Sequence, residues 1–149
     1  MLTTHPGAVR DPATNAAPYG GCAPAAECTT AATLASVPAL RRFARAATAR
    51  WSLTPAVGEA LALVVSELAG NAVRHSGSAD VTLRLSATAT TLIVEVRDHG
   101  HWRHPSRLPS HEPACGGRGL QLVEAYSARC TIHPAPDGTR VTVELPLHR

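Results

Sequence analysis

The spacing of hydrophobic residues along the chain predicts two helices in its first half. Apolar side chains recur every three or four positions over residues 37–51 and again over residues 57–72, which is the period of one buried helix face. Ser36 is placed to cap the first helix, and Thr54 is placed to cap the second. Because a glycine follows shortly after His75, we expect the second helix to end near that residue.

From about position 80 the pattern changes to alternation, which predicts strands with one buried face. Apolar and polar residues alternate over residues 81–85, 92–96 and 141–145. A polar turn at residues 86–90 joins the first two strands as a hairpin, and Pro-Asp-Gly at 136–138 is a strong hairpin turn signal. The last strand is therefore expected to pair with the one before it.

Three further elements are more weakly indicated, namely strands at residues 28–34 and from residue 130, and a short helix over residues 119–127. Helices and strands that each have one apolar face pack together as two layers. We therefore expect an α+β, two-layer sandwich whose mainly antiparallel sheet is covered by helices on one face. The connection over residues 99–115 is long for so small a domain and is expected to be a functional lid.

The N-terminal segment differs in composition from the rest of the chain. Residues 1–26 are rich in Ala, Pro, Gly and Thr, and such a segment buries too little apolar surface to offset the entropy of ordering. We expect residues 1–26 to be a disordered tail. The remaining residues, 27–149, are of the length of a single folded domain.

Charge and composition narrow the classes of function. The formal net charge is only +3, and the aromatic residues are two Trp, two Tyr and one Phe, so direct nucleic-acid binding is not expected. No apolar run approaches the roughly 20 residues that a membrane helix requires, so no membrane association is expected. The four cysteines form no C-x-x-C pair, which argues against a disulfide framework and a cysteine zinc site. A reducing, cytoplasmic location is expected.

Three polar residues share one side of the second predicted helix. Glu67 and Asn71 are separated by roughly 40° around the helix axis, and Arg74 falls within about 20° of Glu67 on the other side. They lie at the margin of the apolar stripe, where a carboxylate and an amide are well placed at the rim of a cleft. For such a pair taken alone, a solvated helix face is the more ordinary explanation.

Two glycine-containing segments add candidate binding groups. Asp98 directly follows an apolar strand and precedes Gly100, so its carboxylate can accept a hydrogen bond from an amino group, although a plain turn explains the same pattern. The sequence Gly-Gly-Arg-Gly at 116–119 opens a helix. Backbone N–H groups there form an anion site, and Arg118 can add a bidentate contact. A flexible hinge is the plainer alternative.

The order of these segments decides between the alternatives. Three segments resemble, in order, the N, G1 and G2 boxes of the GHKL ATPase superfamily: VVSELAGNAVRHSG, LIVEVRDHG and GGRGLQLVEAYS. The arginine-rich helix before the first box and the closing GTRVTVELPL resemble the bacterial anti-sigma factor serine/threonine kinases of the SpoIIAB and RsbW type. The resemblance covers about residues 30–147.

The resemblance implies a Bergerat fold, with a mixed, mostly antiparallel sheet, that binds ATP and Mg²⁺. It implies that Asn71 holds the Mg²⁺ and that Glu67 is the general base. Asp98 is expected to bind the adenine amino group, and Gly100 to let the backbone approach the base. The other residues expected to contact the nucleotide are Arg74, Gly117, Arg118, Gly119 and Leu120.

One position departs from the pattern of the family. The box on the adenine side usually reads D-x-G-x-G, whereas this chain has His101 in place of the second glycine. The imidazole either crowds the nucleotide or folds outward. The departure affects the expected tightness of ATP binding more than the expected fold.

The resemblance also implies an activity and partners. It implies a protein kinase that binds a sigma factor and phosphorylates a Ser or Thr of an anti-anti-sigma (STAS) protein, in the regulation of transcription. It further implies a homodimer. A non-catalytic, ATP-dependent binding module and a simple ATPase are the alternatives.

Overall fold

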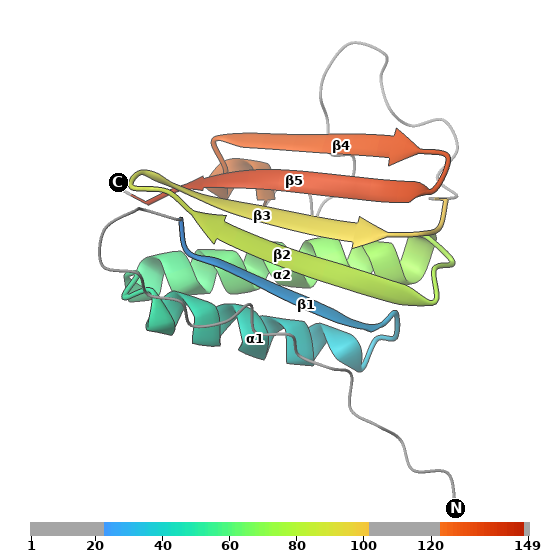
Figure 1. The fold of residues 1–149 in the computed structure, drawn as a ribbon, viewed down its shortest axis with the longest axis horizontal. Coiled ribbons are helices and arrows are strands. Elements are labelled where there is room, and N and C mark those ends of the chain that lie inside the picture. Colours follow the sequence, from blue (N-terminus) through green and yellow to red (C-terminus); the bar gives the residue numbers. More distant parts are fainter. Residues whose placement is uncertain (1–22, 102–122, 148–149) are drawn as a thin grey trace, which may run out of the picture.

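The computed structural model describes residues 23–101 and 123–147, which form an α+β, two-layer sandwich. Two long helices lie side by side on one face of a five-stranded sheet (Figure 1). The expected fold class is confirmed, except that all pairs among the described strands are antiparallel where a mixed sheet was expected. The elements in chain order are β1 (Ala25–Ala31), α1 (Ser36–Arg50), α2 (Pro55–His75), β2 (Asp80–Ala87), β3 (Thr91–Asp98), β4 (Arg129–Ala135) and β5 (Gly138–Pro146).

The central helix, α2, forms as its sequence predicts. Thr54 is extended at the N-cap, and its Oγ1 accepts a hydrogen bond from the backbone N–H of Val57 at 3.4 Å. Pro55 occupies the first turn, where its missing N–H costs nothing. The helix ends at His75, as expected. Its predicted apolar residues are all buried: Val57, Leu61, Val64, Val65, Leu68 and Ala72.

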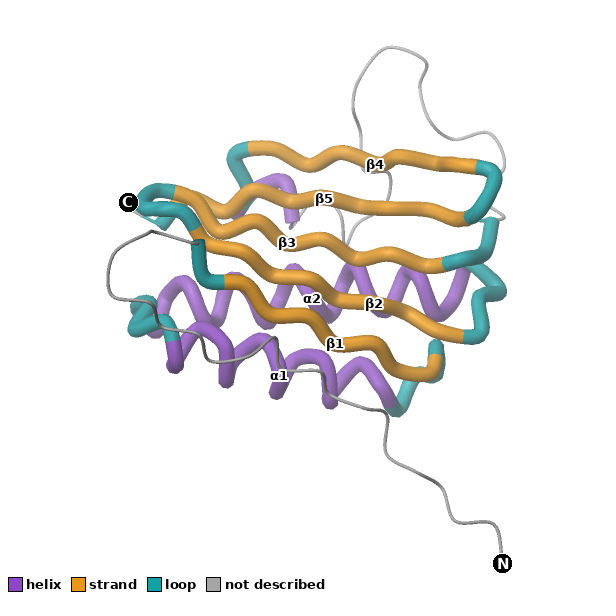
Figure 2. Tube along the Cα trace, viewed as in Figure 1, coloured by secondary structure: helices purple, strands orange, loops and turns teal. Residues whose placement is uncertain are grey.

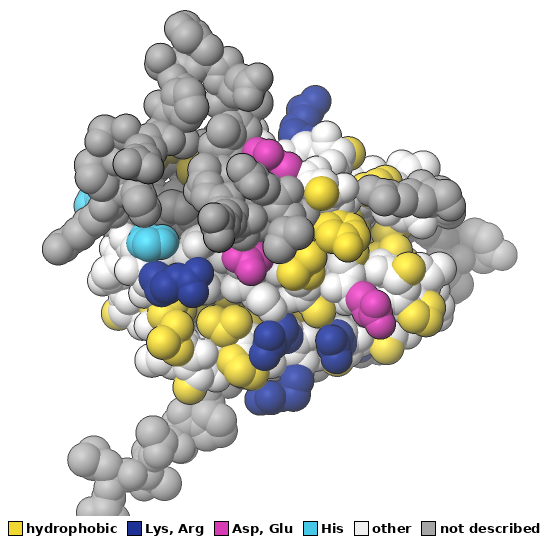
Figure 3. Space-filling view, turned by 180° about the vertical axis from the view of Figure 1, so that it is seen from behind, with side chains coloured by type: hydrophobic (Ala, Val, Ile, Leu, Met, Phe, Trp, Pro, Cys, Tyr) yellow, Lys and Arg dark blue, Asp and Glu magenta, His cyan; other side chains and the backbone are white. Residues whose placement is uncertain are grey.

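The first helix, α1, begins differently from the prediction. Ser36 is its first residue and not its cap, and the N-cap residue Ala35 makes no side-chain hydrogen bond. The Ser36 hydroxyl instead bonds to the Thr33 hydroxyl at 2.9 Å, because Thr33 lies in the tight turn that follows β1. No Asp or Glu occurs in α1. Its exposed Arg42 and Arg45 belong to the helical side of the molecule, where basic side chains gather behind the sheet (Figure 3).

The sheet has the strand order β1-β2-β3-β5-β4, with β3 in the middle (Figure 2). Buried and exposed residues alternate along β2, β3 and β5, as the sequence pattern predicted. On the inner face, Val96 of β3 pairs with Leu83 of β2 and Val141 of β5, and these side chains join α2 in the core. This register leaves Asp98 as the last residue of the central strand.

The N-terminal strand begins earlier than predicted. β1 starts at Ala25, so both the expected strand at residues 28–34 and the expected domain start at residue 27 are placed too late. Ala26 is 4% exposed and belongs to the core. Pairing with β2 recruits these small residues, which no apolar pattern marks. Residues 1–22 of the expected tail lie outside the described residues.

The cysteines contradict one expectation. Cys28 in β1 is free, and its burial raises the pKa of its thiol. Cys130 is disulfide-bonded, and its partner is not among the described residues. Spacing along the chain could not exclude this bond, because a disulfide requires closeness in space only. Since disulfides are uncommon in a reducing cytoplasm, the cysteines no longer support that location.

Within the described ranges, α2 alone is long and apolar enough to cross a membrane, with 21 residues and a mean hydropathy of 1.4. In the fold it packs on α1 and on β2, β3 and β5. The core helix of a globular domain passes the same test of length and composition. The apolar character of α2 is therefore explained by its contacts with both the neighbouring helix and the sheet.

Candidate functional site

The polar residues predicted on α2 share one stripe along the helix. Glu67 and Asn71 are partly buried, and Arg74 is exposed. Arg74 Nη2 donates a hydrogen bond to Asn71 Oδ1 at 3.3 Å. A Cβ at Gly70, on the same stripe, would lie 3.3 Å from Arg74 Nη2. The guanidinium therefore folds back along the helix over Gly70 and Asn71.

A buried carboxylate ends the central strand. Asp98 is 1% exposed, and its Oδ1 accepts a hydrogen bond from the backbone N–H of Gly100 at 3.0 Å. Its register partners are Val81 of β2 and Thr139 of β5. It therefore lies at the edge of the sheet where β3 ends and where β2 and β5 begin. Burying a carboxylate is costly unless hydrogen bonds compensate it. The hydrogen bond from Gly100 is one such bond, and because a carboxylate oxygen can accept more than one, Asp98 is a candidate acceptor for a donor group of a ligand.

Gly100 lies against the C-terminal end of α2. A Cβ at this position would lie 1.8 Å from the carbonyl oxygen of Ser76 and 2.9 Å from the backbone nitrogen of Ser78, so only glycine fits. The resemblance implied that this glycine lets the backbone approach a base. The structure shows a further role, because the close contact joins the strand that carries Asp98 to the helix that carries Asn71.

We expect Gly100→Ala to lower the free energy of unfolding by about 1–3 kcal/mol, because the new methyl group forces two backbone segments apart. Urea unfolding measures this. Gly58→Ala is the matched control, since a Cβ there would be 3.4 Å from Thr48 Oγ1, an ordinary contact. Because alanine is more favourable than glycine in a helix by about 1 kcal/mol, the Gly58→Ala variant should be at least as stable as the wild type. A Gly100→Ala variant as stable as the wild type would contradict the close approach.

Polar residues also hold the segment after α2 and the end of β3 together. Ser78 Oγ donates to the carbonyl of Asp80 at 2.7 Å and accepts from the backbone N–H of His99 at 3.0 Å. His99 Nε2 lies 3.6 Å from Asp80 Oδ1. Gly138, at φ 145° in the β4–β5 turn, also approaches closely, since a Cβ there would lie 2.0 Å from the carbonyl oxygen of Asp98. Polar turn residues are common after helices and strands, so no sequence signal marked the serine.

Two further expectations concern the segment after β3. His101, which replaces the usual second glycine, is exposed at the end of the described segment. Most of the expected lid lies outside the described residues. After this gap, residues 123–126 are helical, and Val123 is buried in the core. The remaining predicted nucleotide contacts also lie outside the described residues, namely Gly117, Arg118, Gly119 and Leu120.

The comparison with protein families decides what kind of domain carries this site. The family model of the histidine kinase-like ATPase domain matches residues 30–145, which is most of the chain. The chain belongs to the histidine kinase-like ATPase domain family. Among curated proteins, none matches the sequence.

Two solved structures are similar to this chain, and the first of them supports the fold. The RsbU and RsbW domains of Rv1364c from Mycobacterium tuberculosis match with a TM-score of 0.64 at 22% identity, over 85% of this chain and 33% of that one. The histidine kinase domain of the blue-light activated histidine kinase EL346 from Erythrobacter litoralis matches with a TM-score of 0.47 at 30% identity, over 60% of this chain and 44% of that one. This chain therefore corresponds to about a third of the first of these chains and to less than half of the second.

The donor set of this histidine kinase-like ATPase domain fits Mg²⁺ held together with a nucleotide. Asn71 Oδ1 is a neutral oxygen that already accepts a hydrogen bond from a cationic side chain. Mg²⁺ prefers oxygen ligands, and protein sites often supply only one or two of them because phosphates and waters complete the shell. Among the described residues, no group of three or more His, Cys, Asp or Glu could hold a metal ion. A metal at this ATPase site would therefore depend on the phosphates of the nucleotide.

The donor set also fits the base of ATP. An ionised carboxylate accepts hydrogen bonds and donates none, so the Asp98 side chain matches the exocyclic amino group of adenine. Its burial removes competition from water, which strengthens such a bond.

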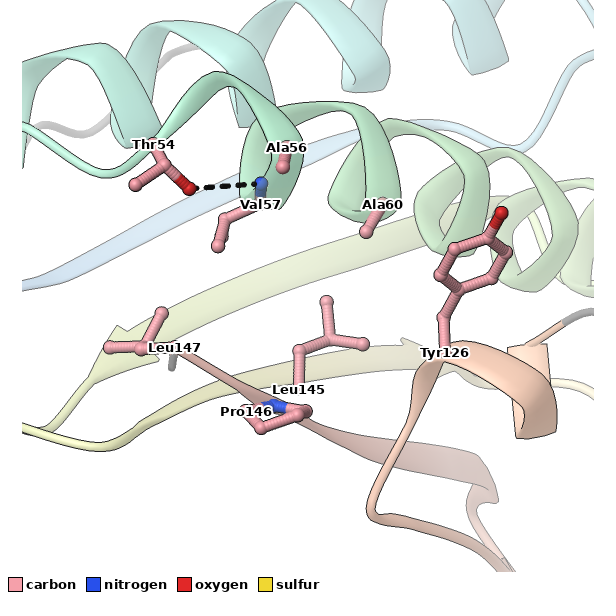
Figure 4. Close-up of a pocket in the computed structure, with 8 residues that line it drawn as sticks. All are labelled: Thr54, Ala56, Val57, Ala60, Tyr126, Leu145, Pro146 and Leu147. Atoms are coloured by element: carbon pink, nitrogen blue, oxygen red, sulfur yellow. Dashed lines mark hydrogen bonds between the residues drawn. The ribbon is translucent and has the colours of Figure 1, made fainter. Parts of the chain in front are cut away.

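A cavity of about 350 Å³ lies elsewhere on the ATPase domain (Figure 4). It lies at the N-terminal end of α2, where Ala60 precedes Glu67 by about 10 Å along the helix axis. On the sheet it reaches Leu145, which pairs with Leu92 near the start of β3, whereas Asp98 ends that strand. The cavity is therefore separate from the candidate site. Its lining residues are Thr54, Ala56, Val57, Ala60, Tyr126, Leu145, Pro146 and Leu147.

Proposed function

We propose that this protein is an ATP- and Mg²⁺-dependent serine/threonine protein kinase of the anti-sigma factor type. In this proposal it acts in the cytoplasm, binds a sigma factor, phosphorylates an anti-anti-sigma (STAS) protein and forms a homodimer. The observation that carries the proposal is the stripe of Glu67 and Asn71 on α2, which the close contact at Gly100 joins to the buried Asp98. The order of the three sequence boxes supports the superfamily, and the arginine-rich helix before the first box and the closing GTRVTVELPL support the choice of subgroup.

The proposed mechanism assigns a task to each of these side chains. When bound, ATP supplies the phosphoryl group and Mg²⁺ offsets its charge. Asp98 would fix the adenine end, and Asn71 Oδ1 would hold the metal once Arg74 has turned away from it. Glu67 would accept the proton of the incoming Ser or Thr hydroxyl. Phosphoryl transfer needs chiefly positioning and charge stabilisation, and a partly buried carboxylate beside a metal-binding amide can supply the remaining proton acceptor.

A non-catalytic, ATP-dependent binding module is the second candidate. The observation that favours it is the hydrogen bond from Arg74 to Asn71 Oδ1, which occupies the oxygen that the metal requires. If Arg74 keeps this bond while the nucleotide is bound, the domain can hold ATP without the metal geometry of transfer. Nothing specific among the described residues favours a simple ATPase.

The decisive experiment incubates the full chain with γ-labelled ATP, Mg²⁺ and purified anti-anti-sigma proteins from the same genome. We expect label on the partner that resists acid, because phosphoesters of Ser and Thr survive acid while phosphohistidine does not. Acid-labile label would contradict the hydroxyl specificity. A chain that binds ATP yet labels no partner would overturn the kinase proposal and leave the binding module.

A further inference from the structure

The outer face of the sheet, opposite the helices, carries charged residues in cross-strand rows. Arg84 of β2 pairs directly with Glu95 of β3, and its Nε lies 3.9 Å from Glu27 Oε2 on β1. Arg129 of β4 pairs directly with Glu144 of β5. Opposite charges at such positions stabilise a sheet. In both rows, therefore, each arginine has a carboxylate on the neighbouring strand.

One row breaks this rule. Arg140 of β5 pairs with Arg97 of β3 on one side and with His133 of β4 on the other. The positive charge of Arg97 is offset by Asp137, whose Oδ2 lies 3.2 Å from Arg97 Nη2. For the exposed Arg140 and His133, the described part of the chain provides no hydrogen bond or ion pair. Like charges placed directly opposite one another are destabilising, so the fold retains this row, which we call the basic row, at some cost.

The basic row also has a shape that can receive a ligand. It borders a hollow of about 190 Å³ on the outer face, beside the β4–β5 turn. The row crosses three strands, which is about 10 Å at the usual spacing of neighbouring strands. The residues that line the hollow are Arg97, His133, Ala135, Asp137, Gly138, Thr139 and Arg140.

We propose that the basic row is a docking site for an acidic segment of a partner protein, with Arg140 binding a carboxylate. A guanidinium presents a planar pair of donors that matches a carboxylate. The row is too short for the many phosphate contacts of a nucleic acid. This inference concerns a face of the sheet that the proposed kinase reaction does not use, and it stands independently of that reaction.

The test uses the full chain and a fluorescein-labelled decapeptide of alternating Glu and Gly, with binding followed by anisotropy at low salt. We expect Arg140→Gln to weaken binding about threefold to tenfold, which is the effect of losing one solvent-exposed hydrogen bond. The matched control is Arg84→Gln, an exposed outer-face arginine that has carboxylate neighbours, and it should change binding less than twofold. The melting temperature of Arg140→Gln should equal or exceed that of the wild type, because a like-charge neighbour is removed.

Four outcomes would overturn the proposal. The first is a wild type that does not bind the peptide at all, and the second is an equal loss of affinity in the two arginine variants. The third is a single-stranded oligonucleotide of equal charge that binds as well as the peptide and with the same dependence on Arg140, which would make the row a general polyanion site. A lower melting temperature for Arg140→Gln would assign the arginine a structural role in the sheet.

Discussion

Glu67→Gln should lower the rate of phosphoryl transfer to a protein substrate by about 10²–10⁴-fold while leaving the affinity for Mg·ATP unchanged. General-base assistance contributes a factor of this size, and glutamine keeps the shape of the side chain but cannot accept the proton. Single-turnover transfer and calorimetry of ATP binding measure the two quantities separately. Asn71→Ala should instead weaken the Mg²⁺-dependent binding of ATP, since it removes the proposed metal ligand.

The control for this experiment is Glu59→Gln on the same helix. Glu59 is exposed, and it lies eight positions before Glu67, which is about 12 Å along the axis. The same chemical change there should leave both transfer and binding at wild-type values. If Glu67→Gln transfers phosphate normally, Glu67 is a polar residue at a helix rim and not the base. Weakened ATP binding by Glu67→Gln would instead give it a binding role.

Asp98→Asn should weaken ATP binding about 5- to 150-fold, which corresponds to the roughly 1–3 kcal/mol lost when a buried polar partner is removed. If the amide oxygen keeps the hydrogen bond from the backbone N–H of Gly100, which Asp98 Oδ1 accepts at 3.0 Å, the amide NH₂ replaces the second oxygen and faces the adenine amino group donor to donor. The new amide donor should favour inosine triphosphate, whose base presents a carbonyl at the same position. Calorimetry of binding to ATP and to inosine triphosphate therefore tests whether the side chain at position 98 hydrogen-bonds to the base.

Asp137→Asn is the matched control for the loss of a carboxylate. Its side chain is 69% exposed in the β4–β5 turn, and its substitution should leave the affinities for both nucleotides unchanged. Circular dichroism of Asp98→Asn shows whether the buried site still folds. A folded Asp98→Asn variant with wild-type preference for ATP would refute the adenine assignment.

Local sequence determined those features that depend only on neighbours along the chain. The apolar period and the Thr54 cap were sufficient to place α2, because hydrogen bonds within a helix are local. The same period brings Glu67, Asn71 and Arg74 onto one stripe wherever the helix lies. Alternation likewise predicted the inner and outer faces of the strands, and the Pro-Asp-Gly turn predicted the last hairpin.

Some local signals failed because a different contact, near or far along the chain, formed instead. Serine is a residue type that commonly caps helices. The hydroxyl of Ser36 is instead hydrogen-bonded to the hydroxyl of Thr33 in the turn after β1. Ala25 and Ala26 carry no apolar periodicity, yet β2 offers them a full set of partners and extends the strand into the expected tail. The energies that separate these outcomes are those of single hydrogen bonds, about 1 kcal/mol each.

Tertiary structure alone decided which distant residues meet. Neither the fit of Gly100 beneath Ser76 nor the burial of Asp98 follows from the residues beside them, because each depends on how the end of a strand meets the end of a helix. The basic row of Arg97, Arg140 and His133 depends on register, and a shift of one residue would send all these side chains to the other face. Chemistry carried by one helix could be predicted from sequence, whereas chemistry shared between elements required the packed fold.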